Sequence, residues 1–156
     1  MNGRYLEDFA VGQTFGSGQL RIEADRAKAF AAEFDPQPFH LDEDAARKSV
    51  FGRLAASGWH TAAATMRLLV DSEFNPAGGI IGAGFEELCW PRPVRPGDVL
   101  RIESEVLEAR PSKSRANQGP DDDAESEWGS GASYRWESDC ALAHGRSRLS
   151  GALRQA

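Results

Sequence analysis

The segment from Gly58 to Val70 carries a wide apolar stripe at helical spacing, and this stripe constrains the fold more than any other feature of the sequence. Its apolar positions recur every three or four residues, as on one side of an α-helix: Trp59, Ala62, Ala63, Met66, Leu69 and Val70. A stripe this wide needs a broad apolar surface against it, so we expect a sheet wrapped around this helix.

Strand signals lie on both sides of the predicted helix. Residues 79–90 and 99–109 are strand candidates after it, and residues 13–22 form a weaker candidate before it because they contain two glycines. The second candidate alternates charged side chains with the apolar side chains of Leu100, Ile102 and Val106. This is the period-two pattern of a half-exposed strand. A helix buried by a curved antiparallel sheet places the chain in the α+β class.

A possible acid/base pair precedes the central helix. Apolar residues at helical spacing predict a helix over 24–34, so Asp35 falls just beyond a helix end. Pro36 and Pro38 stiffen the backbone from there to His40. A carboxyl and an imidazole differ by roughly 2.5 pKa units, so between them they can offer one proton donor and one acceptor at neutral pH. The segment therefore predicts an acid/base pair held in a stiff loop.

The length and the net charge of the chain limit its domain count and the kinds of partner that it can bind. The 156 residues are enough for one domain with a real core, and the net charge of −6 leaves no broad basic surface. We therefore expect neither nucleic acid nor a membrane as a partner. Apolar runs fall short of the ~18 residues of a membrane helix and the first residues lack a signal-peptide core, so we expect a cytoplasmic location. Cys89 and Cys140 lie far apart, which favours reduced thiols.

Several blocks of the sequence follow the order that is typical of one enzyme family. Asp35, Pro38 and His40 resemble the Asp-x-Asn-Pro-x-His loop of the MaoC-like, (R)-specific enoyl-CoA hydratases, with Gln37 at the Asn position. The resemblance covers about residues 5 to 118, and the ordered combination is more specific than any one block. The further matching blocks are Ala45-Ala46, Phe51-Gly52-Arg53, Ala56 to Thr61, Leu88 to Asp98 and Ser112 to Arg115.

The resemblance implies a hotdog fold, in which a curved antiparallel sheet wraps around a long central helix. It also implies addition of water to an enoyl-CoA thioester, or its removal from a 3-hydroxyacyl-CoA, with Asp35 and His40 as the catalytic residues. The backbone N–H of Gly58 would stabilise the thioester oxygen, with Ser57 and Trp59 as neighbouring oxyanion- or substrate-binding residues. This chemistry requires no metal or redox cofactor, since coenzyme A enters as part of the acyl-CoA substrate.

Two further expectations come from the resemblance. Lys113 and Arg115 could contact the phosphates of CoA, although basic residues after a strand are usually solvent-facing. Hotdog domains usually pair through their sheets, so a homodimer or higher homo-oligomer is expected by analogy.

Other interpretations of the same residues stay open. Asp35 could be a turn residue beside prolines and His40 a structural loop histidine. A hotdog acyl-CoA thioesterase would direct a carboxylate-activated water at the thioester carbonyl, although the spacing of Asp35 and His40 suits hydration better. A noncatalytic acyl-CoA-binding or subunit-partner protein is an alternative of a different class, and a damaged gene product without activity is another.

The end of the chain changes abruptly in composition. Residues 117–156 contain no Val, Ile, Phe or Met, whereas strands are normally enriched in β-branched and aromatic residues. The run 120–127 is typical of a solvated acidic loop. We therefore expect a hotdog domain at 1–118 and an atypical tail at 119–156 in place of the last strands. Divergence of the tail and loss of the natural reading frame near Gly119 are equally weighted hypotheses for this change.

Overall fold

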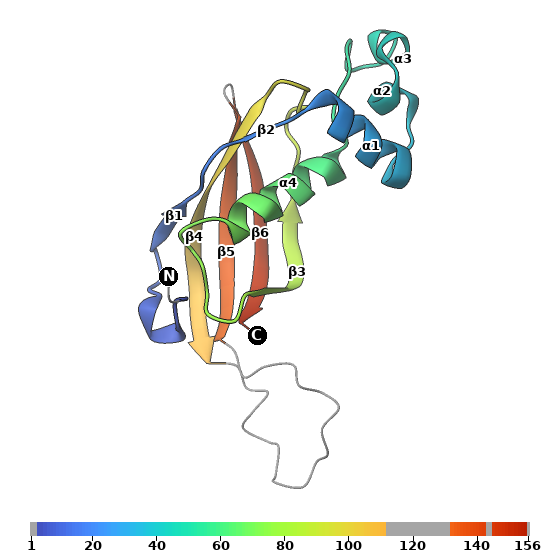
Figure 1. The fold of residues 1–156 in the computed structure, drawn as a ribbon. Helices are drawn as coiled ribbons and strands as arrows, with labels where there is room; N and C mark the ends of the chain where they lie inside the picture. Colours follow the sequence, from blue (N-terminus) through green and yellow to red (C-terminus); the bar gives the residue numbers. More distant parts are fainter. Residues whose placement is uncertain (1–2, 112–131, 143–144, 156) are drawn as a thin grey trace, which may run out of the picture.

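The computed structural model of the protein describes residues 3–111, 132–142 and 145–155 (Figure 1). The helical elements and strands alternate in blocks along the chain. Their bounds are η1 Leu6–Asp8, β1 Thr14–Gly16, β2 Leu20–Arg21, α1 Ala24–Phe34, α2 Pro38–Leu41, α3 Glu43–Arg47, α4 Gly58–Val70, β3 Ile80–Leu88, β4 Val99–Pro111, β5 Ala132–Leu142 and β6 Gly145–Gln155.

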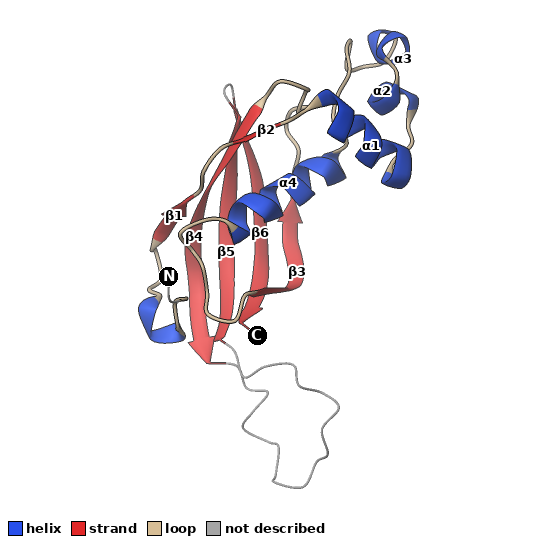
Figure 2. Ribbon diagram, in the orientation of Figure 1, coloured by secondary structure: helices blue, strands red, loops and turns tan. Residues whose placement is uncertain are grey.

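The strands form one antiparallel sheet in the order β1-β4-β5-β6-β3, and β2 also pairs with β4. Helix α4 lies across one face of this sheet, and α1, α2 and α3 gather beyond its N-terminal end (Figure 2). A curved antiparallel sheet around a central helix is the hotdog fold of the α+β class, as the sequence predicted.

The main core lies between α4 and the sheet face that it covers. Leu68 and Leu69 of α4 pack in one buried cluster with Leu100, Ile102 and Val106 of β4. All five are at most 4% exposed. Burial of an aliphatic side chain of this size contributes about 1.5–3 kcal/mol, so the apolar face of α4 fixes the helix against the sheet.

The apolar stripe of α4 is covered on only part of its width. Trp59 remains 56% exposed and Val70 52% exposed. The sheet that was expected to wrap around this helix therefore covers the side of α4 that faces β4 but leaves Trp59 and Val70 exposed.

Several predicted elements are confirmed, with local differences. The helices expected over 24–34 and from Gly58 to Val70 begin and end as predicted. The single strand expected over 13–22 is instead two short strands. Between them Ser17 still pairs with β4, because its N–H donates to the Ile102 carbonyl and its Oγ accepts from the Ile102 N–H at 2.9 Å.

The prediction that residues 119–156 stand in place of the last strands is wrong for the described part of that stretch. Strands β5 and β6 lie there, and β5 pairs with β4 on one side and with β6 on the other. Ladder hydrogen bonds use backbone groups that every residue except proline carries, so neighbouring strands can override a weak strand propensity. The reading-frame hypothesis stays a hypothesis.

Within the described ranges, no helix combines the length and the apolar character that crossing a membrane requires.

Candidate active site

Asp35 is placed by the end of α1. Its backbone N–H donates to the Ala31 carbonyl at 2.9 Å, which makes it the last residue tied to the helix. Pro36 then disfavours helical backbone at the preceding residue, so the chain leaves the helix at this point. The Asp35 side chain is 17% exposed. The end of the helix therefore sets a carboxylate in a half-buried position.

His40 lies in a one-turn helix rather than in the loop that the sequence predicted. Helix α2 begins at Pro38, a residue suited to a first helical position because it lacks an N–H and has a fixed φ. The His40 ring is buried, and its Nδ1 lies 2.8 Å from the Ala55 carbonyl oxygen. A carbonyl only accepts, so Nδ1 carries the hydrogen and Nε2 is left to face the carboxylate.

One atom of the His40 ring faces one oxygen of the Asp35 carboxylate. His40 Nε2 lies 3.4 Å from Asp35 Oδ2, which is longer than an ordinary direct hydrogen bond. A neutral Nε2 and an ionised carboxylate are both acceptors. The pair is therefore arranged to receive hydrogens from a third group, or to share a proton when the ring is charged.

Two donors stabilise the ionised form of Asp35. The Ser57 hydroxyl donates to Oδ2 at 2.6 Å, and the Gln37 amide donates to Oδ1 at 2.8 Å. The Ser57 hydrogen bond is the largest cause that lowers the pKa of Asp35, followed by that of Gln37; burial opposes them, and the nearby His40 ring adds a smaller lowering. Asp35 is thus held as a carboxylate at neutral pH.

Ser57 also begins α4. Its Oγ accepts from the Trp59 N–H at 3.2 Å, so this hydroxyl caps the helix while it donates to Asp35. The N-terminus of the central helix and the carboxylate are therefore fixed relative to each other by one buried side chain.

A cavity of about 310 Å³ opens beside the pair. Both His40 and the start of α4 contribute to its wall, which is lined by Gln37, Phe39, His40, Phe51, Ala56, Gly58, Thr61 and residues 90–94. A Cβ at Gly58 would lie 2.9 Å from the Trp90 ring, so glycine is needed there for packing of the indole. That space is taken by Trp90 rather than left open to a substrate.

The structure brings four of the predicted site residues together: Asp35, His40, Ser57 and Gly58. Trp59 is not among the residues that line the cavity; it makes an edge-to-face contact with Trp90, with ring centroids 5.7 Å apart. Lys113 and Arg115 lie outside the described residues. The catalytic and binding roles themselves stay predictions.

Comparison with known proteins identifies the family. The family model described as "MaoC like domain" matches residues 8–126. The chain belongs to the MaoC-like dehydratase family. A crystal structure of the MaoC-like dehydratase from Rhodospirillum rubrum is 54% identical and superposes with a TM-score of 0.81, covering 97% of this chain and 95% of that one.

Two curated relatives are similar to most of this chain. The uncharacterized protein YdeM of Bacillus subtilis (strain 168) is 35% identical over 109 residues, which are 70% of this chain and 77% of YdeM. The 3-hydroxybutyryl-CoA dehydratase of Methylorubrum extorquens is 30% identical over 112 residues, which are 72% of this chain and 69% of that protein. Hydratase or dehydratase activity in general is therefore the activity of the family to which the chain belongs.

Several residues of this MaoC-like site were missed by the sequence reasoning. Gln37 was noted only as a departure from the family loop, but it donates to Asp35. The Ala55 carbonyl that orients His40 is a backbone group, so no side-chain motif marks it. Trp90 lines the cavity. It lies in the matching block Leu88 to Asp98, where its large aromatic side chain could have marked it as a binding residue.

Arg95 was also missed, and it organises the loop that leads to Ala55. Its guanidinium donates to the carbonyls of Phe51 at 2.9 Å, Arg53 at 3.2 Å and Leu54 at 3.4 Å. The Asp98 carboxylate in turn accepts from the Arg95 N–H at 2.9 Å. The turn after β3 thus holds the backbone that positions the His40 ring.

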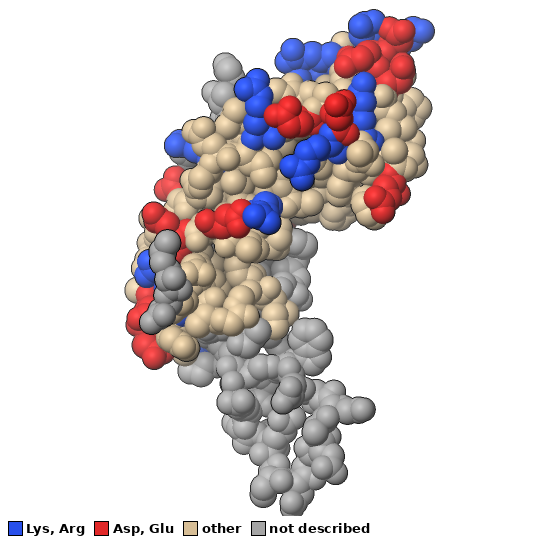
Figure 3. Space-filling view, viewed as in Figure 1, with Lys and Arg blue, Asp and Glu red and all other residues tan. Residues whose placement is uncertain are grey.

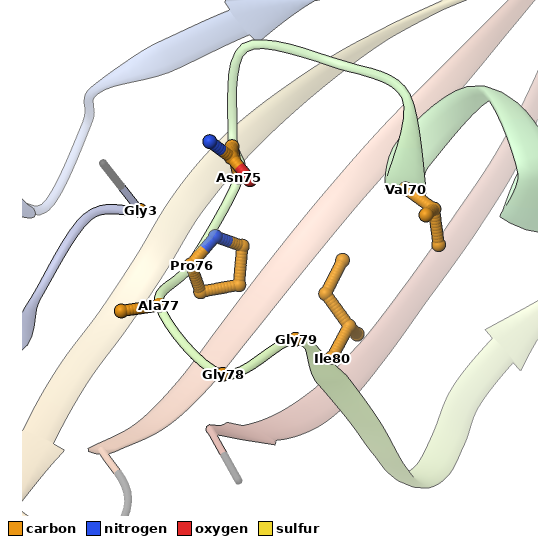
Figure 4. Close-up of a pocket in the computed structure, with 8 residues that line it drawn as sticks. All are labelled: Gly3, Val70, Asn75, Pro76, Ala77, Gly78, Gly79 and Ile80. Carbon is orange, nitrogen blue, oxygen red and sulfur yellow. The ribbon is translucent and has the colours of Figure 1, made fainter. Parts of the chain in front are cut away.

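Another cavity of about 310 Å³ lies at the opposite end of α4, between its last residue and the start of β3 (Figure 4). Its wall is formed by Gly3, Val70, Asn75, Pro76, Ala77, Gly78, Gly79 and Ile80. None of these residues carries a titratable side chain, so this cavity offers no acid, base or nucleophile. The predicted acid/base pair lies instead beside the cavity that His40 lines.

Proposed function

We propose that the protein catalyses the reversible addition of water to a trans-2-enoyl-CoA, which gives a 3-hydroxyacyl-CoA. One observation carries the proposal: the Ala55 carbonyl occupies Nδ1 of His40, so Nε2 presents its lone pair beside the Asp35 carboxylate. A water molecule that donates one hydrogen to each acceptor would be held with its oxygen free to attack. Membership of a dehydratase family supports this reaction type.

In the proposed hydration, His40 takes one proton from water and returns it to the substrate. The ring takes one proton from water through Nε2 while the water oxygen bonds to C3 of the enoyl group, and the π electrons move toward the thioester as an enolate. The imidazolium then returns that proton to C2, and the second hydrogen of the water remains on the new hydroxyl. Dehydration is the reverse.

Asp35 is assigned to positioning and charge stabilisation in this mechanism. Its lowered pKa makes it a poor proton donor at neutral pH, so it stays ionised through the cycle. Its Oδ2 accepts one hydrogen of the water, and its charge stabilises the imidazolium when His40 is protonated. The spacing of the two residues leaves open which is the base and which is the acid, and the direction of the Asp35 pKa shift supports the assignment proposed here.

The start of α4 is the proposed site for the charge that develops on the thioester oxygen. The first N–H groups of a helix lack partners within it, and they carry the positive end of the helix dipole. Gly58 is the first residue of α4, and it lines the cavity together with His40. We assign its backbone N–H as an oxyanion donor.

The substrate class is supported by the name of one relative, a 3-hydroxybutyryl-CoA dehydratase, which acts on a CoA thioester by that name. Because the reaction proposed for Asp35 and His40 uses only a carboxylate, an imidazole and backbone donors, it requires no metal or redox cofactor.

We also propose that the protein works as a homodimer. Strand β3 is the last strand of the sheet order, and an edge strand exposes backbone groups that can pair with another chain. Trp59 and Val70 leave an apolar face exposed on α4. A second copy placed against the β3 side of the sheet could cover both features.

The test is incubation of the purified protein with crotonyl-CoA while the ultraviolet absorbance of the conjugated thioester is followed. We expect the absorbance to fall to an equilibrium value, with 3-hydroxybutyryl-CoA as the product. A thiol reagent in a parallel reaction detects free CoA, whose release would indicate a thioesterase instead. If the absorbance stayed unchanged with both the folded wild type and Asp35→Asn, the result would favour a noncatalytic acyl-CoA-binding or subunit-partner protein.

A further inference from the structure

A third cavity, of about 330 Å³, lies between β2, α1 and α4. Helix α4 contributes Gly58 and Thr61 to the cavity beside His40 but a different set of residues to this one, on another side of the helix. The two cavities share no lining residue. The full wall of the third cavity is Leu20, Arg21, Glu23, Arg26, Phe30, His60, Ala63, Ala64 and Arg67.

The wall of this cavity carries three guanidinium groups from three elements. Arg21 lies 4.0 Å from Glu23, and Arg67 pairs with Asp71 at 2.6 Å, so acidic neighbours offset two of the charges. Arg26 has no ion pair or hydrogen bond with the described part of the chain. On the face drawn in Figure 3, basic side chains gather over the end formed by β2 and the first helices, with acidic ones between them.

His60 adds a polar group that the described residues do not satisfy. Its Nδ1 is buried and has no hydrogen-bond partner within the described residues. Burial is the largest cause that lowers the pKa of His60, and the positive charge of Arg26 lowers it further. Glu23 is the one carboxylate among the described residues of the wall, and it lies beside Arg21. His60 Nδ1 is therefore left without a partner among the described residues, and a buried polar nitrogen favours one.

The remainder of the wall is apolar. The Phe30 ring packs against the His60 ring with centroids 5.2 Å apart, and Leu20, Ala63 and Ala64 line the same space. A ligand that fits this wall has an anionic head for the guanidinium groups and a short apolar body for the ring and the alkyl side chains.

We propose that this cavity binds a small organic anion, a carboxylate on a short apolar body. The carboxylate lies against Arg26, with Arg21 and Arg67 at the rim, and the body lies against Phe30. The site is separate from the proposed hydration and does not depend on it.

The probe for this site is sodium benzoate, followed by NMR of the histidine ring signals, with His60 assigned through His60→Gln. We expect saturable shifts of the His60 signals, with the His40 signals unchanged. Bound benzoate also raises the pKa of His60, because its negative charge stabilises the protonated ring. The other charged groups that line the cavity are Arg21, Arg26 and Arg67, which disfavour the protonated ring, and Glu23, which favours it.

Arg26→Gln tests the charge contact, since Arg26 is exposed and its replacement leaves the core intact. Loss of one charge-assisted contact weakens benzoate binding about ten-fold. The matched control is Arg47→Gln on α3, whose guanidinium pairs with Asp44 instead; it binds benzoate as the wild type does. Benzamide, which has the same ring without the charge, leaves the His60 signals in place.

Three results would overturn the proposal: no saturable shift at His60, equal binding of benzoate and benzamide, or equal affinity in Arg26→Gln and Arg47→Gln. Inorganic phosphate is run alongside, and if it bound as tightly as benzoate the apolar wall would have no role. Asp35→Asn keeps the benzoate response while it abolishes the proposed hydration, so failure of one assignment is distinguishable from failure of the other.

Discussion

Asp35 and His40 are each held by partners that the other does not share. Ser57 and Gln37 donate to the carboxylate, whereas the Ala55 carbonyl fixes the imidazole. Because the two sets of hydrogen bonds are separate, the ionisation of Asp35 and the orientation of His40 can be changed independently. Variants at single residues can therefore test the two parts of the site one at a time.

Ser57→Ala removes the largest stabiliser of ionised Asp35 and the cap of α4 together. We expect the pKa of Asp35 to rise toward its ordinary value of 3.8 and the free energy of unfolding to fall by about 1 kcal/mol, as for loss of a helix cap. Carbon NMR of the Asp35 carboxyl and urea unfolding measure the two effects.

Ser72→Ala is the matched control for this variant. Ser72 donates to the Leu69 carbonyl and accepts from the Phe74 N–H just beyond the far end of α4. We expect it to lower stability without changing the pKa of Asp35. An unchanged Asp35 titration in Ser57→Ala would show that the hydroxyl does not set the ionisation of the carboxylate.

The lowered pKa of Asp35 also predicts how stability depends on pH. A carboxyl whose pKa is lower in the folded state stabilises the protein above its unfolded value of 3.8, and that contribution is lost as the pH falls through the folded value. The stability advantage of the wild type over Asp35→Asn should therefore shrink on acidification in this window. A difference in unfolding free energy that stays constant with pH would contradict the assignment.

Between elements, the site depends on a contact from the turn after β3 to the loop before α4. Arg95 donates to three carbonyls of that loop, and the loop ends at Ala55, which orients His40. Arg95 therefore acts on the His40 ring through the backbone that it stabilises. It acts as a positioning residue in this arrangement.

Arg95→Met retains much of the apolar stem of the side chain and removes its donors. We expect faster amide hydrogen exchange over residues 51–55 and a fall in kcat larger than any rise in KM. The reason is that His40, the proposed proton acceptor, is less well held while the cavity remains. The exposed Arg47→Met on α3 is the control, for which neither quantity should change. If amide hydrogen exchange over residues 51–55 were the same in Arg95→Met as in the wild type, Arg95 would not be a positioning residue.

For the whole molecule, the exposed apolar side chains on α4 and the position of β3 at the end of the described sheet both predict pairing of two chains. Val70 is 52% exposed on α4, and Val70→Glu places a charge in the proposed interface. We expect light scattering after size exclusion to give the mass of a dimer for the wild type and a shift toward monomer for this variant.

Val50→Glu is the control, because Val50 is 97% exposed and belongs to the segment between α3 and α4 rather than to α4 itself. It should leave the dimer mass unchanged. A wild-type protein that is monomeric at the concentrations of the activity assay, and still active, would exclude the dimer as the working form.

The sequence predicts those parts of this molecule that depend on local spacing. The apolar repeats fix α1 and α4, and the Asp35 to His40 segment predicts the pair that the structure brings to 3.4 Å. The contacts from Arg95 to the loop and from Ala55 to His40 join distant parts of the chain through backbone groups, which leave no pattern in the sequence. The strands β5 and β6 were missed because pairing partners rather than residue types define them.

The central claim is that Asp35 and His40 act as one unit on a single water molecule. The most direct measurement compares crotonyl-CoA hydration by Asp35→Asn, His40→Asn and the double variant, with folding checked by circular dichroism. His40→Asn retains an amide that can donate to the Ala55 carbonyl. Residues that act as a unit give non-additive losses, so we predict that either single variant lowers kcat by at least about a hundred-fold and that the double variant loses little more. Losses that multiply, or a double variant that retains wild-type turnover, would contradict the account.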